Sequence, residues 1–441
     1  MLIFRSHGKQ IELLGSTIVE WLAYGLAVFL ILFPKGGFKA GSVPLTWGYG
    51  LIGIALIFGV PFWLLRISPK IPRGILGLSL SLAPLQLLFL YSLLFNGFAD
   101  FGFALSDLVA FFLLPFAFVG IFSQFLPEIR MERLLVLARW LIFLAAAYGI
   151  FLFVWRLTTG TYIEIPFLTV NLDDIGTLDS KYNSRSGGLF KLISTYNNGN
   201  QYGVATLLLL PLFDAFEHSR FRKLLVRAAL VLTLSRTVWI GLILNEAFDV
   251  GRHLLGDLRS SKKFSIRLSV RYSTFFGFGR LALATAFVLG MTLLFSGVSF
   301  LFDSSLGGRT VYFEDAGPLT VFPSAPVAQF AEIIYLSALT MLGWAGLAAV
   351  VLLFCSPVLL AIRFEELRRT TLQVAALQGL ILYIPLAAMD GALNYIPTMA
   401  FYWFLWMLFI YGGSYDGPRA TRYKANVRQI FTRRAPRSLT S

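Results

Sequence analysis

The chain is a succession of long apolar runs separated by shorter polar stretches. A membrane-spanning helix needs about 20 consecutive, mainly apolar residues, and ten runs meet this description. They lie near 17–34, 46–66, 74–94, 105–126, 134–157, 199–217, 281–302, 333–354, 371–390 and 397–413. This pattern predicts a polytopic integral membrane protein. The fold should be all-α, because a spanning helix satisfies its own backbone hydrogen bonds.

A further apolar run, 224–248, is too long for one span and is interrupted by Ser235 and Arg236. We interpret it as two shorter helices, 224–234 and 237–248, that turn at the arginine. The chain then has about 12 transmembrane helices. With no internal repeat and no sizeable soluble domain, residues 1–413 are expected to form one transmembrane helical domain, followed by a basic tail, 414–441.

The distribution of basic residues orients these helices. Of the 37 Lys and Arg residues, 29 fall on the side of the two termini, which the positive-inside rule places in the cytoplasm. A single span over 224–248 would instead put the basic run from Arg252 to Arg280 outside. The predicted topology has two long periplasmic loops, 158–198 and 303–332, and a basic cytoplasmic loop, 249–280. We therefore expect a multi-pass membrane protein with both termini in the cytoplasm and with Arg236 facing the periplasm or the exterior.

Composition narrows the function classes. Charged residues make up 14% of the chain, against about 25% in soluble domains. The net charge of +14 fits cytoplasmic loops facing anionic lipid, so no nucleic-acid partner is inferred. A lone cysteine, Cys355, excludes an internal disulfide and a thiolate metal site. No small-residue cleavage pattern follows the first apolar run, so we interpret it as a span and not as a signal peptide.

Two arginines on the outer face are the leading candidates for chemistry. Arg236 interrupts an apolar hairpin, and Arg309 lies in the second long loop. A guanidinium binds phosphate oxygens two at a time, and that face carries few other cations. The pair predicts a site for an anionic lipid head group. The alternatives are a snorkelling anchor for Arg236 and an ordinary interfacial cation for Arg309.

Other outer-face residues are candidates for substrate contacts, and each has a plainer interpretation. Arg185 has aspartates nearby, Asn198 and Asn200 are good helix N-caps, and tyrosines such as Tyr312 and Tyr335 are common at membrane interfaces. Asp390 and Asn394 lie in a short outer turn. The acidic pairs Asp173-Asp174 and Glu314-Asp315 form only a weak divalent-ion pattern, so no metal or other cofactor is expected.

In arrangement, the chain resembles the O-antigen polymerase and O-antigen ligase family of membrane glycosyltransferases, over roughly residues 180–355. Four elements carry the resemblance. The first is an arginine-glycine-phenylalanine element leading to paired asparagines (Arg185, Gly188, Phe190, Asn198, Asn200), and the second is a threonine-x-serine-arginine turn (Thr233, Ser235, Arg236). The third is a further arginine in a large outer loop (Arg309), and the fourth is a helix start with spaced glycines (Tyr335, Leu336, Gly343, Gly346). Ligases of this family place a histidine three residues before that tyrosine, where this chain has Glu332. This departure favours a polymerase or another exopolysaccharide-building member.

The resemblance implies a GT-C-like fold and an undecaprenyl-pyrophosphate-linked glycan as donor. Arg236 and Arg309 would neutralise the leaving pyrophosphate, and Glu332, at a partly desolvated membrane edge, would act as general base. One displacement at C1 would invert the configuration without a metal. Membrane lipid and a chain-length regulator are the expected partners. There are two alternatives: a ligase that transfers finished polymer to lipid A core or another acceptor, and a transporter or flippase of lipid-linked sugar. The transporter is disfavoured because the bilayer midplane is expected to be nearly free of charge, the candidate residues lie on one face and no repeat is visible.

Overall fold

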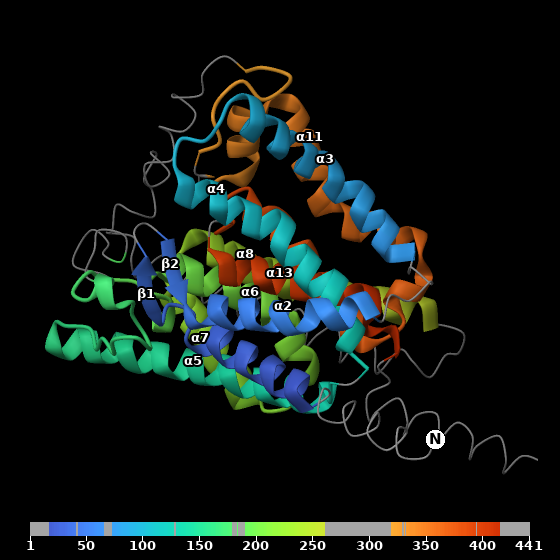
Figure 1. The fold of residues 1–441 in the computed structure, drawn as a ribbon. Helices are drawn as coiled ribbons and strands as arrows, with labels where there is room; N and C mark the ends of the chain where they lie inside the picture. The colour runs from blue at the N-terminus through green and yellow to red at the C-terminus, as the bar shows by residue number, and fades with distance from the viewer. Residues whose placement is uncertain are drawn as a thin grey trace, which may run out of the picture.

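The structure is a computed structural model that describes residues 17–40, 43–65, 73–127, 129–178, 183, 190–260, 319–328, 330, 332–393 and 395–414. The described part is mostly helical (Figure 1). In chain order its main elements are the helix Thr17–Leu32, β1 (Gly37–Ala40), β2 (Val43–Thr46), α2 (Trp47–Leu65), α3 (Arg73–Phe95), the helical stretch Phe101–Phe125 that begins with α4 (Phe101–Leu108), α5 (Met131–Thr159), α6 (Gly199–Phe216), α7 (Arg220–Leu232), α8 (Arg236–Ser260), α11 (Ile334–Arg363), α12 (Thr371–Ala387) and α13 (Ile396–Tyr411).

The helices coincide with the apolar runs of the sequence. Four of them, α3, Phe101–Phe125, α5 and α11, are long and apolar enough to cross a membrane. The run 224–248 is divided as expected, because α7 ends at Leu232 and α8 begins at Arg236. One boundary was wrong: α8 continues to Ser260, so the first part of the predicted loop 249–280 is helical. The run 281–302 lies outside the described residues.

The core is built around α6. Its residues from Tyr202 to Phe213 are all buried, and the helix packs against α5, α8, α12 and α13. Close approach to α8 is possible because Gly203 and Gly241 lack a side chain. A Cβ at Gly203 would lie 2.1 Å from Val238 Cγ2, and one at Gly241 would lie 2.5 Å from Leu207 Cδ1. These contacts also show that α6 and α8 run in the same direction.

The helices α3 and α11 lie side by side along most of their length (Figure 1). Inside α11 the backbone is broken at Gly343, which has φ 70° and ψ −171°. The amides of Trp344 and Ala345 bond instead to the carbonyls of Thr320 and Val321, both at 3.0 Å. Glycine is required here, because a Cβ would lie 2.6 Å from the Thr320 carbonyl oxygen and left-handed φ disfavours any side chain. Gly343, one of the spaced glycines of the sequence pattern, thus allows the break in α11 and the close approach of residues 320–321.

One departure from the all-helical expectation is the hairpin of β1 and β2, which pair antiparallel with Gly37 opposite Thr46. It connects the helix Thr17–Leu32 to α2. The hairpin is held to the loop after α5 by a bridge from Gly37 to Asn171 and by the Trp47 indole N–H, which donates to the Phe167 carbonyl at 2.6 Å. This loop is part of the predicted long loop 158–198, whose described residues beyond the end of α5 include two short 3-10 helices, Leu172–Asp174 and Ser194–Tyr196.

Candidate functional site

Four helices begin at the same end of the bundle, which we call the site end. The start of α6 lies beside the start of α8, and the loop between α12 and α13 lies beside the start of α11, where the Gly391 amide donates to the Glu332 carbonyl at 3.0 Å. Tyr395, just before α13, packs its ring against Tyr196, just before α6 (5.9 Å between centroids). Unpaired amides and the helix dipole make each such start electropositive, so their convergence favours an anionic ligand.

A buried polar chain crosses the site end. Lys191 Nζ donates to Asn200 Oδ1 at 3.2 Å, and Asn200 Nδ2 donates to Asp390 Oδ2 at 2.6 Å. Lys191 is 5% exposed and Asp390 is 4% exposed. Burying charges is costly unless they are hydrogen-bonded, and the amide of Asn200 meets this need for both. The chain therefore ties together the segment before α6, the first turn of α6 and the loop after α12.

Asparagines shape the entry into α6. Asn198 is its N-cap, with Oδ1 accepting from the amides of Asn200 (2.8 Å) and Gln201 (3.4 Å). Asn183 Nδ2 donates to the carbonyls of Leu178 and Asn197, at 2.9 and 2.8 Å. The plainer interpretation of Asn198 as a cap is thus confirmed. Asn200, in contrast, uses its side chain to connect two charged groups.

Several buried polar atoms at the site end have no hydrogen-bond partner among the described residues. They are Asn183 Oδ1, Thr195 Oγ1, Asn197 Oδ1, Gln201 Oε1 and the Tyr395 hydroxyl. Most buried polar atoms in native proteins are bonded to protein or to ordered water. A group of such atoms at one place is the pattern expected where a hydroxyl-rich ligand or water completes the bonding.

Backbone strain is concentrated at the same end. Of the five described non-glycine residues with positive φ, four border the site end: Ser194 (52°), Asn197 (59°), Leu234 (48°) and Ala392 (45°). Such conformations cost on the order of 1–3 kcal/mol each and collect at functional sites. They occur in the segment before α6, in the turn before α8 and in the loop after α12. All three segments supply candidate site residues.

Arg236 is the first residue of α8 and is half-buried. A cation is unfavourable at a helix N-terminus, so its position adds to the positive potential instead of offsetting a dipole. The turn before it is fixed by Thr233 Oγ1, which donates to the Leu230 carbonyl at 2.7 Å. The Leu192 amide, next to Lys191, donates to the Leu232 carbonyl at 3.0 Å. This bond places the segment of Lys191 beside the turn that precedes Arg236.

Two candidates from the sequence look different in the structure. Glu332 lies at the site end, and the protein leaves its side chain exposed, so any desolvation of this carboxylate has to come from the membrane edge and not from neighbouring side chains. Tyr335 serves in helix packing: its hydroxyl donates to the Ile384 carbonyl at 3.0 Å and its ring meets Phe354 edge-on. Arg309, Arg185 and Tyr312 lie outside the described residues, as does Asn394.

Sequence reasoning missed Lys191 and Lys35. Lys35 Nζ lies 4.6 Å from the ring centroid of Tyr395, a cation–π distance. Both lysines belong to the small group of cations on the outer face in the predicted topology, and this scarcity was the signal that could have identified them. With Arg236 they bring three cations to the site end.

Charged residues also lie within the described helices, and several of them are paired with one another. Arg227 Nη2 contacts both Asp214 Oδ2 (2.8 Å) and Glu246 Oε1 (2.5 Å) in the space between α6, α7 and α8. In α4, Asp107 is fully buried, and neither carboxylate oxygen has a hydrogen-bond partner among the described residues. Buried ionisable residues in apolar helices are retained for a reason.

Within the described residues, no group of three or more His, Cys, Asp or Glu side chains is placed to hold a metal ion. Comparison of the chain with models of known protein families and with curated proteins finds no match.

Proposed function

We propose that this protein is a membrane glycosyltransferase that polymerises lipid-linked glycan units. It would transfer an undecaprenyl-pyrophosphate-linked glycan to a sugar hydroxyl of another lipid-linked unit, on the periplasmic face of the inner membrane. The proposal includes about 12 spans in a GT-C-like arrangement, without a metal. The resemblance to O-antigen polymerases and ligases described above is its starting point.

The observation that carries the proposal is the composition of the site end. Half-buried Arg236 starts α8, buried Lys191 is bonded through Asn200 to Asp390, and neighbouring buried amide and hydroxyl oxygens have no partner among the described residues. Cations and helix starts suit a pyrophosphate. Amide and hydroxyl groups suit sugar hydroxyls. A lipid-linked glycan carries both kinds of group on one molecule.

The reaction is one displacement at carbon. The acceptor oxygen forms a bond to C1 of the donor sugar, while the bond from C1 to the phosphate oxygen breaks and its electron pair leaves with the pyrophosphate. Arg236, with Arg309 as the second predicted arginine, stabilises the charge that develops on the leaving group. The hydroxyl proton passes to a carboxylate of the site end. Glu332, which is exposed, and Asp390, which is buried beside Asn200, compete for this role.

Deletion of the gene in its host tests the proposal. The cell-surface polysaccharide is separated on a gel, and the lipid-linked pool is analysed in parallel. Loss of long polymer with accumulation of single lipid-linked units is the expected result. Full-length polymer that stays on the lipid carrier would identify a ligase instead, and an unchanged polymer with unchanged lipid-linked pools would reject both.

Point variants then assign roles in the deletion strain. Arg236→Gln and Lys191→Met should abolish polymer, whereas Arg363→Gln, at the exposed end of α11, is the charge-matched control and should restore it. Glu332→Gln and Asp390→Asn distinguish the two carboxylates, because the variant that loses more polymer formation identifies the base. Wild-type activity in both carboxylate variants would contradict a base at either position.

A transporter of lipid-linked sugar is the second candidate, favoured by a specific observation. The chain has a buried acid, Asp107, in an apolar helix and a helix, α11, interrupted at Gly343. Transporters use both features near the middle of the bilayer. Accumulation of lipid-linked units on the cytoplasmic face in the deletion strain would support this alternative, and accumulation on the periplasmic face would support the polymerase.

A further inference from the structure

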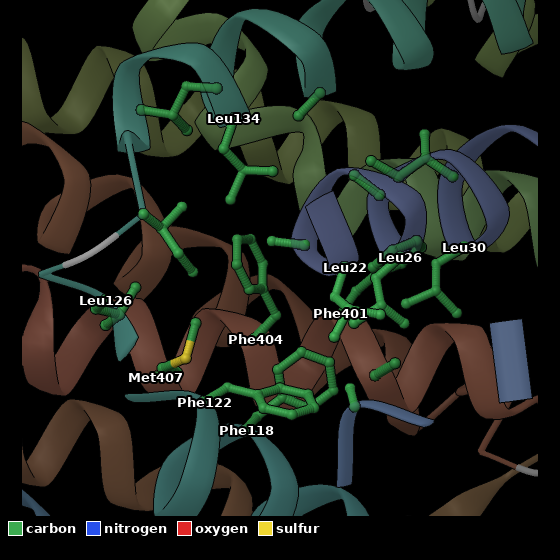
Figure 2. A pocket seen from close by; sticks show the side chains of 18 of the residues that line it. Leu22, Leu26, Leu30, Phe118, Phe122, Leu126, Leu134, Phe401, Phe404 and Met407 are labelled. Carbon is green, nitrogen blue, oxygen red and sulfur yellow. The ribbon is translucent and has the colours of Figure 1, made fainter. Parts of the chain in front are cut away.

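A cavity of about 410 Å³ lies inside the bundle. Its walls come from the helix Thr17–Leu32, α2, the stretch Phe101–Phe125, α5, α6 and α13. Figure 2 shows leucine, phenylalanine and methionine side chains from these helices around one common space. Every described lining residue is apolar except Arg139, whose Nη1 donates to the Phe216 carbonyl.

Neither empty space nor water suits this cavity. Protein interiors pack as densely as organic crystals, and a large void forfeits dispersion contacts along its whole lining. A buried water needs two to four polar partners, and the described lining offers one polar side chain, Arg139, whose Nε alone has no partner among the described residues. Hydrocarbon is the one material that satisfies these walls, and a helical protein of this hydropathy is surrounded by it in a bilayer.

The shape of the cavity selects one kind of hydrocarbon. Residues of the first helix line it from Ile18 to Ile31 at helical spacing, which corresponds to about 20 Å at 1.5 Å per residue. A fatty acyl chain spans one leaflet, about 15 Å or half of the hydrocarbon core. The cavity therefore matches a single acyl chain, whereas a long polyisoprenoid exceeds it.

The cavity also has a way in from the side. Ile18 and Phe58 both line it, yet they are 44% and 53% exposed, so the wall between the first helix and α2 is open where these residues meet the surroundings. The antiparallel packing of these helices, with Gly48 beside Leu30 and Gly25 beside Leu51, places Ile18 and Phe58 at the same level. We propose that one acyl chain of a bilayer phospholipid enters between Ile18 and Phe58 and occupies this cavity as a bound lipid.

Lipid retention by the full chain tests the proposal. Protein extracted into detergent and passed through size exclusion should retain about one phospholipid per chain by mass spectrometry, and Ala55→Trp should lower this about tenfold by filling the space. Ala138→Phe, from the facing wall, should do the same if the first variant does not fold. Ile57→Trp is the control on the same helix, because Ile57 is 71% exposed and points away from the cavity.

A second measurement does not depend on substitutions. The full chain in phosphatidylethanolamine and phosphatidylglycerol vesicles is irradiated with a phospholipid whose acyl chain ends in a diazirine. Adducts on Leu22, Leu26 and Phe122 are expected. Adducts only on outward residues such as Leu76 and Leu80, or retention by Ala55→Trp and Ala138→Phe equal to wild type, would overturn the proposal. So would a retained polyisoprenoid, or cross-linking of residues 1–16 into the cavity.

Discussion

The two ends of the α6–α8 region are built in opposite ways. At the site end, buried amide and hydroxyl oxygens have no partner among the described residues, and four non-glycine residues have positive φ. At the other end, which we call the paired end and define by Asp214, Glu217, Arg222, Arg227 and Glu246, the charged groups satisfy one another. Glu217, for example, accepts from the His218 and Ser219 amides and from Arg222.

This difference separates groups that hold the fold from groups that are available for a ligand. Arg227 bonds two carboxylates, and Arg222 also stacks over the Trp140 ring at 3.8 Å, so these charges are committed to structure. Even there the bonding is incomplete, since Arg139 Nε and Asn245 Nδ2 have no described partner. The site end nevertheless concentrates both the open polar atoms and the strain, and it is the better place to look for function.

The largest effect on stability is expected at the paired end. Arg227→Ala leaves buried Glu246 without its cation and leaves half-buried Asp214 with Lys223 alone, at 3.8 Å, which should lower the free energy of unfolding by about 3–5 kcal/mol. Thermal unfolding in detergent measures the change, with Arg363→Ala as the exposed control. An unchanged melting temperature for Arg227→Ala would mean that the paired end does not hold the helices together.

The break in α11 comes next. Gly343→Ala places a Cβ 2.6 Å from the Thr320 carbonyl oxygen at φ 70°, so we expect a loss of about 1–3 kcal/mol. Gly53→Ala is the matched control, because a Cβ at Gly53 in α2 meets nothing within 4 Å. Equal unfolding temperatures for the two variants would show that the close approach of residues 320–321 is not needed.

The two ends can be compared directly through their helix caps. Asn198 caps α6 at the site end, and Thr370 caps α12 in a capping box with Gln373. Each change to alanine should cost about 1 kcal/mol. Polymer formation should fall only with Asn198→Ala, because that cap positions Asn200 between Lys191 and Asp390. Equal losses of polymer in both variants would remove the functional distinction between these caps.

The smallest effect on stability is expected for Arg236→Gln. A half-buried residue whose charge opposes the helix dipole contributes little to folding, so the change should stay within about 0.5 kcal/mol. Loss of polymer at unchanged melting temperature would sharpen the contrast with Arg227. A loss of stability as large as that of Arg227→Ala would place Arg236 among the structural charges.

How much the sequence could predict is clear at particular residues. The turn between α7 and α8 followed from Ser235 and Arg236, because two polar residues in the middle of an apolar run that is too long for one span predict a break there. Asn198 was recognisable as a cap from its local pattern. The sequence could not predict the hydrogen bonds that link Lys191, Asn200 and Asp390. Asn200 and Asp390 lie 190 positions apart, and only the packing of α6 against α12 brings them together. The exposure of Glu332 was likewise a matter of tertiary surroundings.

By itself, the sequence determined the helices, their approximate ends and the division of 224–248, because apolar run length and interrupting polar residues are local properties of the chain. Only the tertiary structure decided which polar residues meet. It bonded Asn200 to both charged partners, gave Arg227 two carboxylates and left a cavity along the first helix. The physical reason is that the burial and the hydrogen-bond partners of a side chain depend on which helix faces pack together. Shape complementarity between segments that are distant in the sequence determines this packing.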